Sequence, residues 1–215
     1  MSSLREVKER IGSVRSTLKI TSAMQLVSSS KLLKAQKAIE ALRPYEETLV
    51  DILRRIPSAR PAPAQQSSSR VLVLAFAGST SLCGAFNSNA VKLALQVISE
   101  AGDEVEVWAF GRKMAEALRK AGYAPARDLS SLVATPDPEA VTRLSDELRG
   151  LYDSGSVGRI VLVYNHFASI GKQIPTKEQF LPFTLPEHDA VPEDEDYFIL
   201  EPSAAELAAA LMPQV

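Results

Sequence analysis

The N-terminal 56 residues carry apolar side chains at alternating steps of three and four, and twelve of the sixteen positions in this seam are apolar. The seam consists of Leu4, Val7, Ile11, Val14, Leu18, Thr21, Gln25, Ser28, Leu32, Ala35, Ile39, Leu42, Glu46, Leu49, Leu53 and Ile56. An average spacing of about 3.5 residues keeps one stripe of a helix facing a second helix, so the pattern predicts a coiled-coil helix. No other segment shows a matching heptad pattern, so something else must cover the seam.

The middle of the seam is polar, and the apolar stripe shifts there. The polar positions are Thr21, Gln25 and Ser28, and the residues that replace them one position earlier are Ile20, Met24 and Val27. The shift turns the stripe by about 100°, so the helix is expected to meet two different surfaces.

Pro44 follows Arg43 inside the helical pattern. Proline removes one backbone donor and clashes with the preceding turn, so a kink or a break between two helices is expected there. Two ordinary amphipathic helices on a globular core are the alternative, although core helices rarely hold one register over this length.

Beyond Ile56 the pattern changes twice. Residues 57–70 are rich in Pro, Ala, Ser and Gln and are interpreted as a linker. Residues 71–202 then alternate between strand and helix patterns, which predicts an α/β fold with a mostly parallel sheet. The predicted strands are 71–76, 104–110, 158–164 and 197–200, and the predicted helices are 88–100, 112–121, 138–152 and 204–212. Asn87 or Ser88, Asp137 and Ser203 are the expected N-caps. Residues 203–215 are interpreted as the start of a C-terminal helix.

Charge divides the chain unevenly. Residues 1–60 hold twelve Lys and Arg against six Asp and Glu, and the remainder holds twelve against twenty. Between Arg10 and Lys37 there are six basic residues and no acidic one. This helix is therefore expected to bind a negatively charged surface, either nucleic acid or an acidic protein collar, although many charge runs are only solvated faces.

Composition indicates a globular chain. The longest apolar runs are of strand length, and the N-terminus lacks a signal-peptide pattern, so a cytoplasmic protein without a targeting peptide is expected. Cys83 is the only cysteine, which excludes an internal disulfide.

The loop Gly78–Gly84 lies between a strand and a helix, where phosphate loops and nucleophile elbows occur, but neither motif fits. The only Gly-Lys pair, Gly171-Lys172, is followed by Gln173. Cys83 is interpreted as a buried small residue rather than a nucleophile, because only His166 and His188 could serve as imidazole bases. No ligand spacing indicates a metal site, and we expect no cofactor.

Several motifs in order resemble the gamma subunit of the F-type rotary ATP synthase. They are Lys19-Ile20-Thr21, Ala23-Met24, Lys31-Leu32, Arg43-Pro44-Tyr45, Leu82-Cys83-Gly84, Asn87-Ser88-Asn89, Gly111-Arg112-Lys113, Val161–Phe167 with Ser169, Leu181-Pro182, Glu201-Pro202-Ser203 and Leu211-Met212-Pro213. The resemblance implies a long N-terminal coiled-coil shaft helix and a Rossmann-like foot domain.

The resemblance also implies a non-catalytic rotor subunit. Such a shaft turns inside a ring of alternating alpha and beta subunits and couples proton or sodium flow through the membrane ring to ATP synthesis or hydrolysis. The implied partners are the alpha and beta subunits, the epsilon subunit and the membrane c-ring, on the cytoplasmic face of a bacterial membrane without direct insertion. The implied contact residues are Arg10, Lys19, Ile20, Met24, Val27, Lys31 and Lys34.

Two departures from the family are evident. The family usually has Ser-Asp-Arg or Lys-Gly before Leu-Cys-Gly, where this chain has Gly78 to Ser81, so a loop charge pair is lost. The family chain also continues past the equivalent of Met212-Pro213 into a second shaft helix, whereas this sequence stops at Val215. Truncation of the reading frame is favoured over a fragment boundary or a divergent paralogue.

Three functional alternatives remain beside the rotor. A basic helical arm could bind nucleic acid, although its most basic stretch has no aromatic residue for stacking. A divergent, non-rotary paralogue would have its seam covered by another chain. An α/β enzyme using Cys83 is the third alternative.

Overall fold

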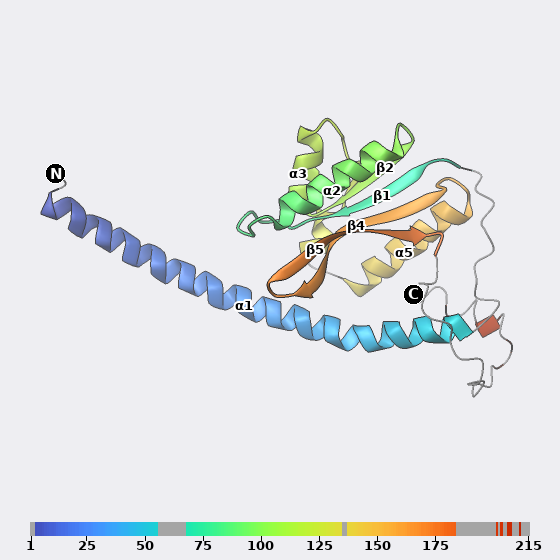
Figure 1. The fold of residues 1–215 in the computed structure, drawn as a ribbon, viewed down its shortest axis with the longest axis horizontal. Helices are drawn as coiled ribbons and strands as arrows, with labels where there is room; N and C mark the ends of the chain where they lie inside the picture. Colours follow the sequence, from blue (N-terminus) through green and yellow to red (C-terminus); the bar gives the residue numbers. More distant parts are fainter. Residues whose placement is uncertain are drawn as a thin grey trace. The chain divides into compact units, whose positions relative to one another are not determined.

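The computed structural model describes residues 3–55, 68–134 and 137–183, together with residues 201, 203, 206, 207 and 211. These residues divide into two units, which are described separately. One unit contains the long helix α1, and the other contains a five-stranded sheet with its helices (Figure 1).

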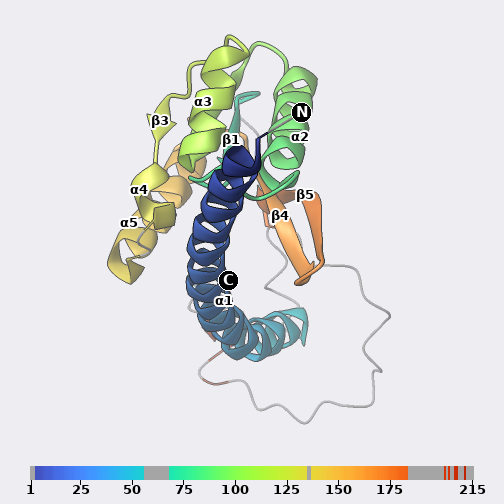
Figure 2. The ribbon, with the colours of Figure 1, turned by 90° about the vertical axis from the view of Figure 1, so that its left-hand side faces the viewer.

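Helix α1 (Leu4–Arg55) runs for 52 residues without interruption. Of the two outcomes predicted at Pro44, the break between two helices is therefore wrong, and the kink stays a prediction. Proline removes only one backbone hydrogen bond, and residues with high helix propensity on both sides carry the helix across that position. Thr48 donates its hydroxyl to the Pro44 carbonyl at 2.7 Å. Figure 2 shows α1 as a curved rod.

The sheet has the order β3-β2-β1-β4-β5. Its strands are β1 (Val71–Phe76), β2 (Val105–Phe110), β3 (Arg127–Asp128), β4 (Arg159–Ser169) and β5 (Lys172–Leu181). β1 pairs in parallel with β2 and β4, β2 pairs in parallel with β3, and β4 pairs antiparallel with β5. The predicted mostly parallel α/β sheet is confirmed.

Alternation along β1 builds a core on each face of the sheet. Val71, Val73 and Ala75 pack with buried residues of α2 (Phe86–Ala101) and α3 (Arg112–Lys120). Leu72 and Leu74 pack on the other face with buried residues that include Leu148 of α5 (Pro138–Asp153). The short helix α4 (Ser130–Ala134) lies on the same side as α5 (Figure 2). Covering both faces explains why β1 is apolar at all six positions.

The predicted helix caps have different outcomes. Asp137 caps α5 as expected, because its side chain accepts a hydrogen bond from the Glu139 amide. Ser203 accepts a hydrogen bond from the Glu206 amide at 3.2 Å, as predicted for a cap. The prediction for α2 is wrong, since that helix begins at Phe86 with Ala85 as its N-cap. Asn87 instead turns its side chain back to the preceding loop.

The sequence patterns missed β3, α4 and β5. β5 reads KQIPTKEQFL and is mostly exposed, so it lacks the apolar alternation by which strands are recognised. Pro175 within it is tolerated because β5 is an edge strand. Most of the expected linker, the strand 197–200 and most of the helix 204–212 lie outside the described residues.

Candidate functional site

The seven contact residues implied by the family resemblance all lie on α1 and are all exposed. Ile20, Met24 and Val27 have 62%, 49% and 57% of their surface accessible, which is unusual for three large apolar side chains within eight residues. The described part of the chain leaves this surface uncovered.

Six of these seven residues share one stripe of the helix. Ile20, Met24, Val27, Lys31 and Lys34 follow one another at steps of four, three, four and three, which places neighbours on the same face. Arg10 lies on the N-terminal extension of that line, through Ser13 and Thr17. We call these six residues the contact stripe. Lys19 lies about 100° away around the helix.

The basic side chains of this region are available for a partner. Arg10, Lys19, Lys31 and Lys34 form no ion pair with any residue of the described ranges. The ion pair at the helix start, Arg5 Nε to Glu9 Oε1 at 3.2 Å, lies outside the region. The stripe therefore combines apolar contact area with uncompensated positive charge.

Hydroxyl groups along the same helix are satisfied internally. Ser16 and Thr17 donate to the carbonyls of Gly12 and Ser13, each at 3.1 Å. Thr21 donates to the carbonyls of Thr17 and Leu18, each at 3.0 Å. These bonds leave each hydroxyl oxygen able to accept a hydrogen bond without exposing an unpaired donor.

The seam changes character along α1. Leu4 and Leu42 are 90% and 61% exposed, whereas Leu49 and Leu53 are 5% and 0% exposed. The uncovered part of the seam therefore extends from Leu4 to Leu42. Across the described residues, no helix combines the length and apolar character needed to cross a bilayer.

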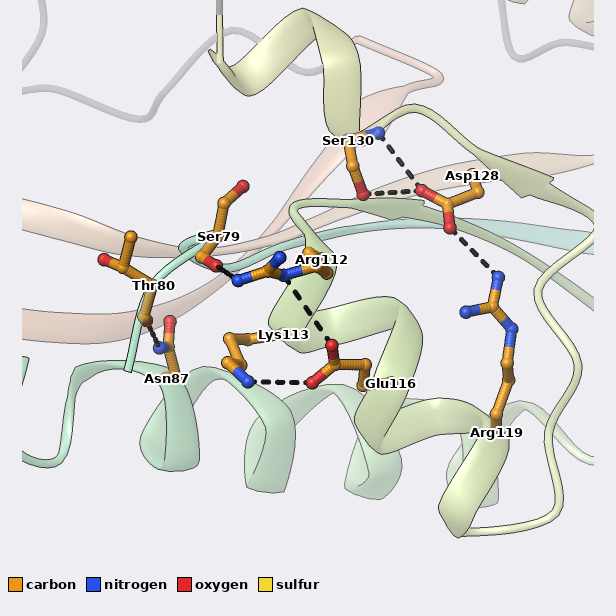
Figure 3. Close-up of polar contacts among 9 residues, drawn as sticks. All are labelled: Ser79, Thr80, Asn87, Arg112, Lys113, Glu116, Arg119, Asp128 and Ser130. Carbon is orange, nitrogen blue, oxygen red and sulfur yellow. Dashed lines mark hydrogen bonds and ion pairs between the residues drawn. The ribbon is translucent and has the colours of Figure 1, made fainter. Parts of the chain in front are cut away.

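The loop that follows β1 is held by side chains from two helices (Figure 3). The Asn87 amide accepts a hydrogen bond from the Gly78 N–H at 2.7 Å and donates to the Thr80 carbonyl at 2.8 Å. Arg112 Nη2 donates to the Ser79 carbonyl at 3.0 Å. These contacts fix the loop backbone, and Leu82 on this loop is 87% exposed. Sequence reasoning missed this role of Asn87, which it considered only as a possible N-cap of the helix that follows.

Charged side chains beside this loop pair with one another. Glu116 lies 2.8 Å from Lys113 Nζ and 3.7 Å from Arg112 Nε. The hydrogen bond from Lys113 is the main reason that the pKa of Glu116 lies below its ordinary value. Near the C-terminal end of α3, Arg119 Nη2 lies 3.0 Å from Asp128, which also accepts hydrogen bonds from Ser130. Ser130 contributes most to the lowered pKa of Asp128, and Arg119 adds to it.

The residues that the sequence offered as catalytic candidates lie in different parts of the fold. Cys83 is half-buried rather than buried, and it receives a hydrogen bond from Asn87 Nδ2 at 3.0 Å. His166 lies on β4, and His188 lies outside the described residues. Gly171 lies in the turn between β4 and β5, and Lys172 begins β5. Among the residues described, no group of three or more His, Cys, Asp and Glu could hold a metal ion.

Comparison with known proteins gives a consistent result. The family model described as ATP synthase matches residues 3–215. The ATP synthase gamma chain of Bacteroides thetaiotaomicron is 40% identical over 235 aligned positions, which cover 100% of this chain and 79% of that protein.

Solved structures show the same fold at low sequence identity. The central stalk and c-ring structure of the Tetrahymena thermophila mitochondrial ATP synthase matches with a TM-score of 0.62 at 16% identity, covering 91% of this chain and 86% of that chain. The rotor of the Euglena gracilis mitochondrial ATP synthase matches with a TM-score of 0.58 at 17% identity, covering 97% and 75%.

Proposed function

The chain belongs to the family of ATP synthase gamma chains, and on this premise we propose that it is the central-stalk rotor subunit of an F-type ATP synthase. It transmits rotation between a proton-driven membrane ring and the catalytic ring of alpha and beta subunits. The single observation that carries this proposal is α1, a 52-residue helix whose large apolar side chains are exposed over most of its length.

The subunit itself is non-catalytic in this proposal. Asn87 and Arg112 form hydrogen bonds with backbone groups of the loop after β1. The sequence of this loop lacks the Gly-Lys pair of the motif that binds nucleotide phosphates. The nucleotide chemistry would belong to the alpha and beta subunits. The other partners would be the epsilon subunit and the c-ring, on the cytoplasmic face of the membrane.

The contact stripe, with Lys19, is the proposed surface for the alpha and beta ring. Apolar side chains at its centre suit a close protein surface, and the positive charge along it suits an acidic collar. The proposed organisation has the shaft helix in residues 1–56, a linker in 57–70, the foot in 71–202 and the start of a further helix in 203–215.

A rotation experiment tests the proposal. An immobilised ring of alpha and beta subunits is combined with the Cys83→Ser chain that carries a bead on Ile170→Cys, in the exposed turn between β4 and β5. ATP is expected to drive continuous rotation of the bead in one direction. Stable ring binding without rotation would instead identify a non-rotary paralogue.

The nucleic-acid alternative makes a different prediction. If α1 were a DNA-binding arm, its affinity for DNA would fall steeply as the salt concentration rises. DNA binding would also not require the ring of alpha and beta subunits. We expect saturable binding to the ring and no comparable binding to arbitrary duplex DNA at physiological salt. The opposite pattern would overturn the rotor assignment.

A further inference from the structure

The loop between β1 and α2, residues 77–85, lies at the switch point of the sheet. From β1 the chain builds β2 and β3 on one side and later returns to build β4 on the other side, and α2 and α5 cover opposite faces. Open α/β sheets bind their ligands outside the carboxyl ends of the strands at such a point. This loop therefore occupies the position where this class of sheet commonly makes functional contacts.

The Asn87 amide directs both its oxygen and its nitrogen to this loop. Its Oδ1 accepts a hydrogen bond from the Gly78 N–H at 2.7 Å. Its Nδ2 donates to the Thr80 carbonyl at 2.8 Å and to Cys83 Sγ at 3.0 Å. The Gly78 N–H requires an acceptor, which fixes the orientation of the amide. A Cβ on residue 78 would lie 3.0 Å from Asn87 Oδ1, so the glycine leaves room for this amide.

The same loop is also held from α3 and from β4. Arg112 Nη2 donates to the Ser79 carbonyl at 3.0 Å (Figure 3). Asn165 Nδ2 donates to the Phe86 carbonyl at 2.9 Å, where the loop joins α2. Because the loop backbone is already ordered, a partner that binds it loses little affinity to conformational entropy.

Leu82 is the side chain that this ordered loop presents to solvent. Among the described residues of the α/β unit, it is the most exposed large apolar side chain, at 87%. The hydrogen bonds to the backbone of the loop keep it from folding this side chain back onto the sheet. Burial of a leucine side chain against a partner contributes directly to affinity.

The surroundings of Leu82 carry an excess of positive charge. Residues 71–91 contain no charged side chain. Arg112, which binds the loop, and Lys113 beside it pair with a single carboxylate, Glu116, so one positive charge is in excess. The contact stripe of α1 has the same combination of apolar and basic side chains, and an acidic protein partner suits both.

We propose that Asn87 is a positioning residue, which holds Leu82 in place for a contact with the ring of alpha and beta subunits. This inference rests on the rotor function proposed above and adds a contact outside α1. Asn87 acts through the loop, because its amide is committed to loop groups, and Leu82 makes the contact itself.

A double-mutant cycle tests this assignment. Titration of the labelled full chain gives its dissociation constant for a ring of alpha and beta subunits. We expect Leu82→Ala to raise this constant by about tenfold. Asn87→Ala should raise it by a similar factor, and the double variant should bind little more weakly than either single variant. If the two losses multiply to about a hundredfold, Asn87 does not act through Leu82 and the proposal is overturned.

Two control variants separate the contact from general effects of the substitutions. Asn89→Ala makes the same change two residues further along α2, at an exposed position. Val141→Ala shortens another exposed apolar side chain, which is 50% exposed on α5. Both should leave the dissociation constant within about threefold. Equal losses from Val141→Ala and Leu82→Ala would show that no specific contact exists at Leu82.

Hydrogen exchange of the Gly78 amide measures the hold of Asn87 on the loop directly. Asn87→Ala should speed this exchange by at least about tenfold, because it removes the acceptor of the Gly78 N–H. Leu82→Ala should leave the exchange unchanged, because it removes a side chain that is already in solvent. Unchanged exchange in Asn87→Ala would contradict the positioning role.

Failure of this proposal can be distinguished from failure of the rotor function. If the parent chain binds and turns in the ring, and Leu82→Ala binds equally tightly, the rotor function stands and the contact at Leu82 is wrong. If the parent chain does not bind the ring at all, both proposals are wrong.

Discussion

Gly111 fixes the junction between β2 and α3. Its φ is +96°, and a Cβ atom placed on it would lie 1.9 Å from the Ala77 carbonyl oxygen. The atom that the Cβ would meet belongs to the backbone at the end of β1. This backbone is hydrogen-bonded to β2, so it cannot move away without breaking the sheet. This single residue therefore allows β1 and α3 to approach closely at the loop that Asn87 and Arg112 hold.

Gly111→Ala is expected to lower the free energy of unfolding by more than about 2 kcal/mol, since it combines left-handed strain with a backbone clash. Urea unfolding followed by circular dichroism measures the change. Gly122→Ala is the matched control, because its φ is +87° and nothing lies within 4 Å of the added Cβ. The control should lower the free energy of unfolding by about 1 kcal/mol. Equal losses in the two variants would show that the backbone moves to relieve the clash at residue 111 without cost.

The ionisation of Asp128 makes the stability of the α/β unit depend on pH. Because its pKa in the folded chain is lowered, chiefly by Ser130, the ionised carboxylate stabilises the fold above the ordinary aspartate pKa of about 3.9. That contribution is lost as the pH falls through the lowered pKa.

Asp128→Asn should therefore be less stable than the parent at pH 7, and the difference should shrink below about pH 4. Thermal unfolding at both pH values measures it. Ser130→Ala retains the carboxylate but removes its main donor, so it should show the same trend to a smaller extent. A difference that is independent of pH would assign the effect to packing rather than to charge.

At the scale of elements, the helix propensity of α1 outweighs the local disruption that Pro44 causes. Its 52 residues include Pro44, which the rest of the helix accommodates. The missing N–H leaves the Glu40 carbonyl without its usual partner, so the turn before Pro44 has one helical hydrogen bond fewer than an ordinary turn.

Pro44→Ala should stabilise this turn, by up to about 3 kcal/mol of local opening free energy, because it restores one hydrogen bond and removes a clash. Hydrogen exchange of the amides in residues 41–48 measures the effect, and slower exchange is expected there. Amides near Val14 serve as an internal reference and should not change. Unaltered exchange in 41–48 would mean that the proline imposes no local weakness.

At the scale of the whole molecule, charged residues are distributed unevenly along the chain. The N-terminal 60 residues are basic and the remainder is acidic, which suits the proposed insertion of α1 into an acidic partner. This arrangement places the binding charge on α1 alone.

Lys31→Glu combined with Lys34→Glu should weaken binding to the ring of alpha and beta subunits by about 10- to 100-fold, because both residues lie on the contact stripe. Arg15→Glu is the control, since Arg15 is exposed and basic but lies about 140° around the helix from Ile20. Titration of labelled chain at two salt concentrations measures the affinities, and the loss should be smaller at high salt. Equal loss from the control would show that net charge, rather than the stripe, determines binding.

The sequence predicted much of this structure because the strongest signals are local. The strand at 71–76 and the cap at Asp137 follow from short apolar runs and one side-chain hydrogen bond. β5 and the role of Asn87 could not be predicted, because they depend on a partner strand and on a loop nine residues away. The contact stripe follows from helical spacing, and its function as a ring contact stays a prediction.

The sequence by itself determined the helical seam, the parallel βαβ core and the family, because periodicity and motif order are properties of the chain. Tertiary structure decided that β5 pairs antiparallel with β4 and that Asn87 serves the loop rather than the helix. In each case the deciding interaction is a backbone or amide hydrogen bond, whose partner is fixed only when the chain is folded.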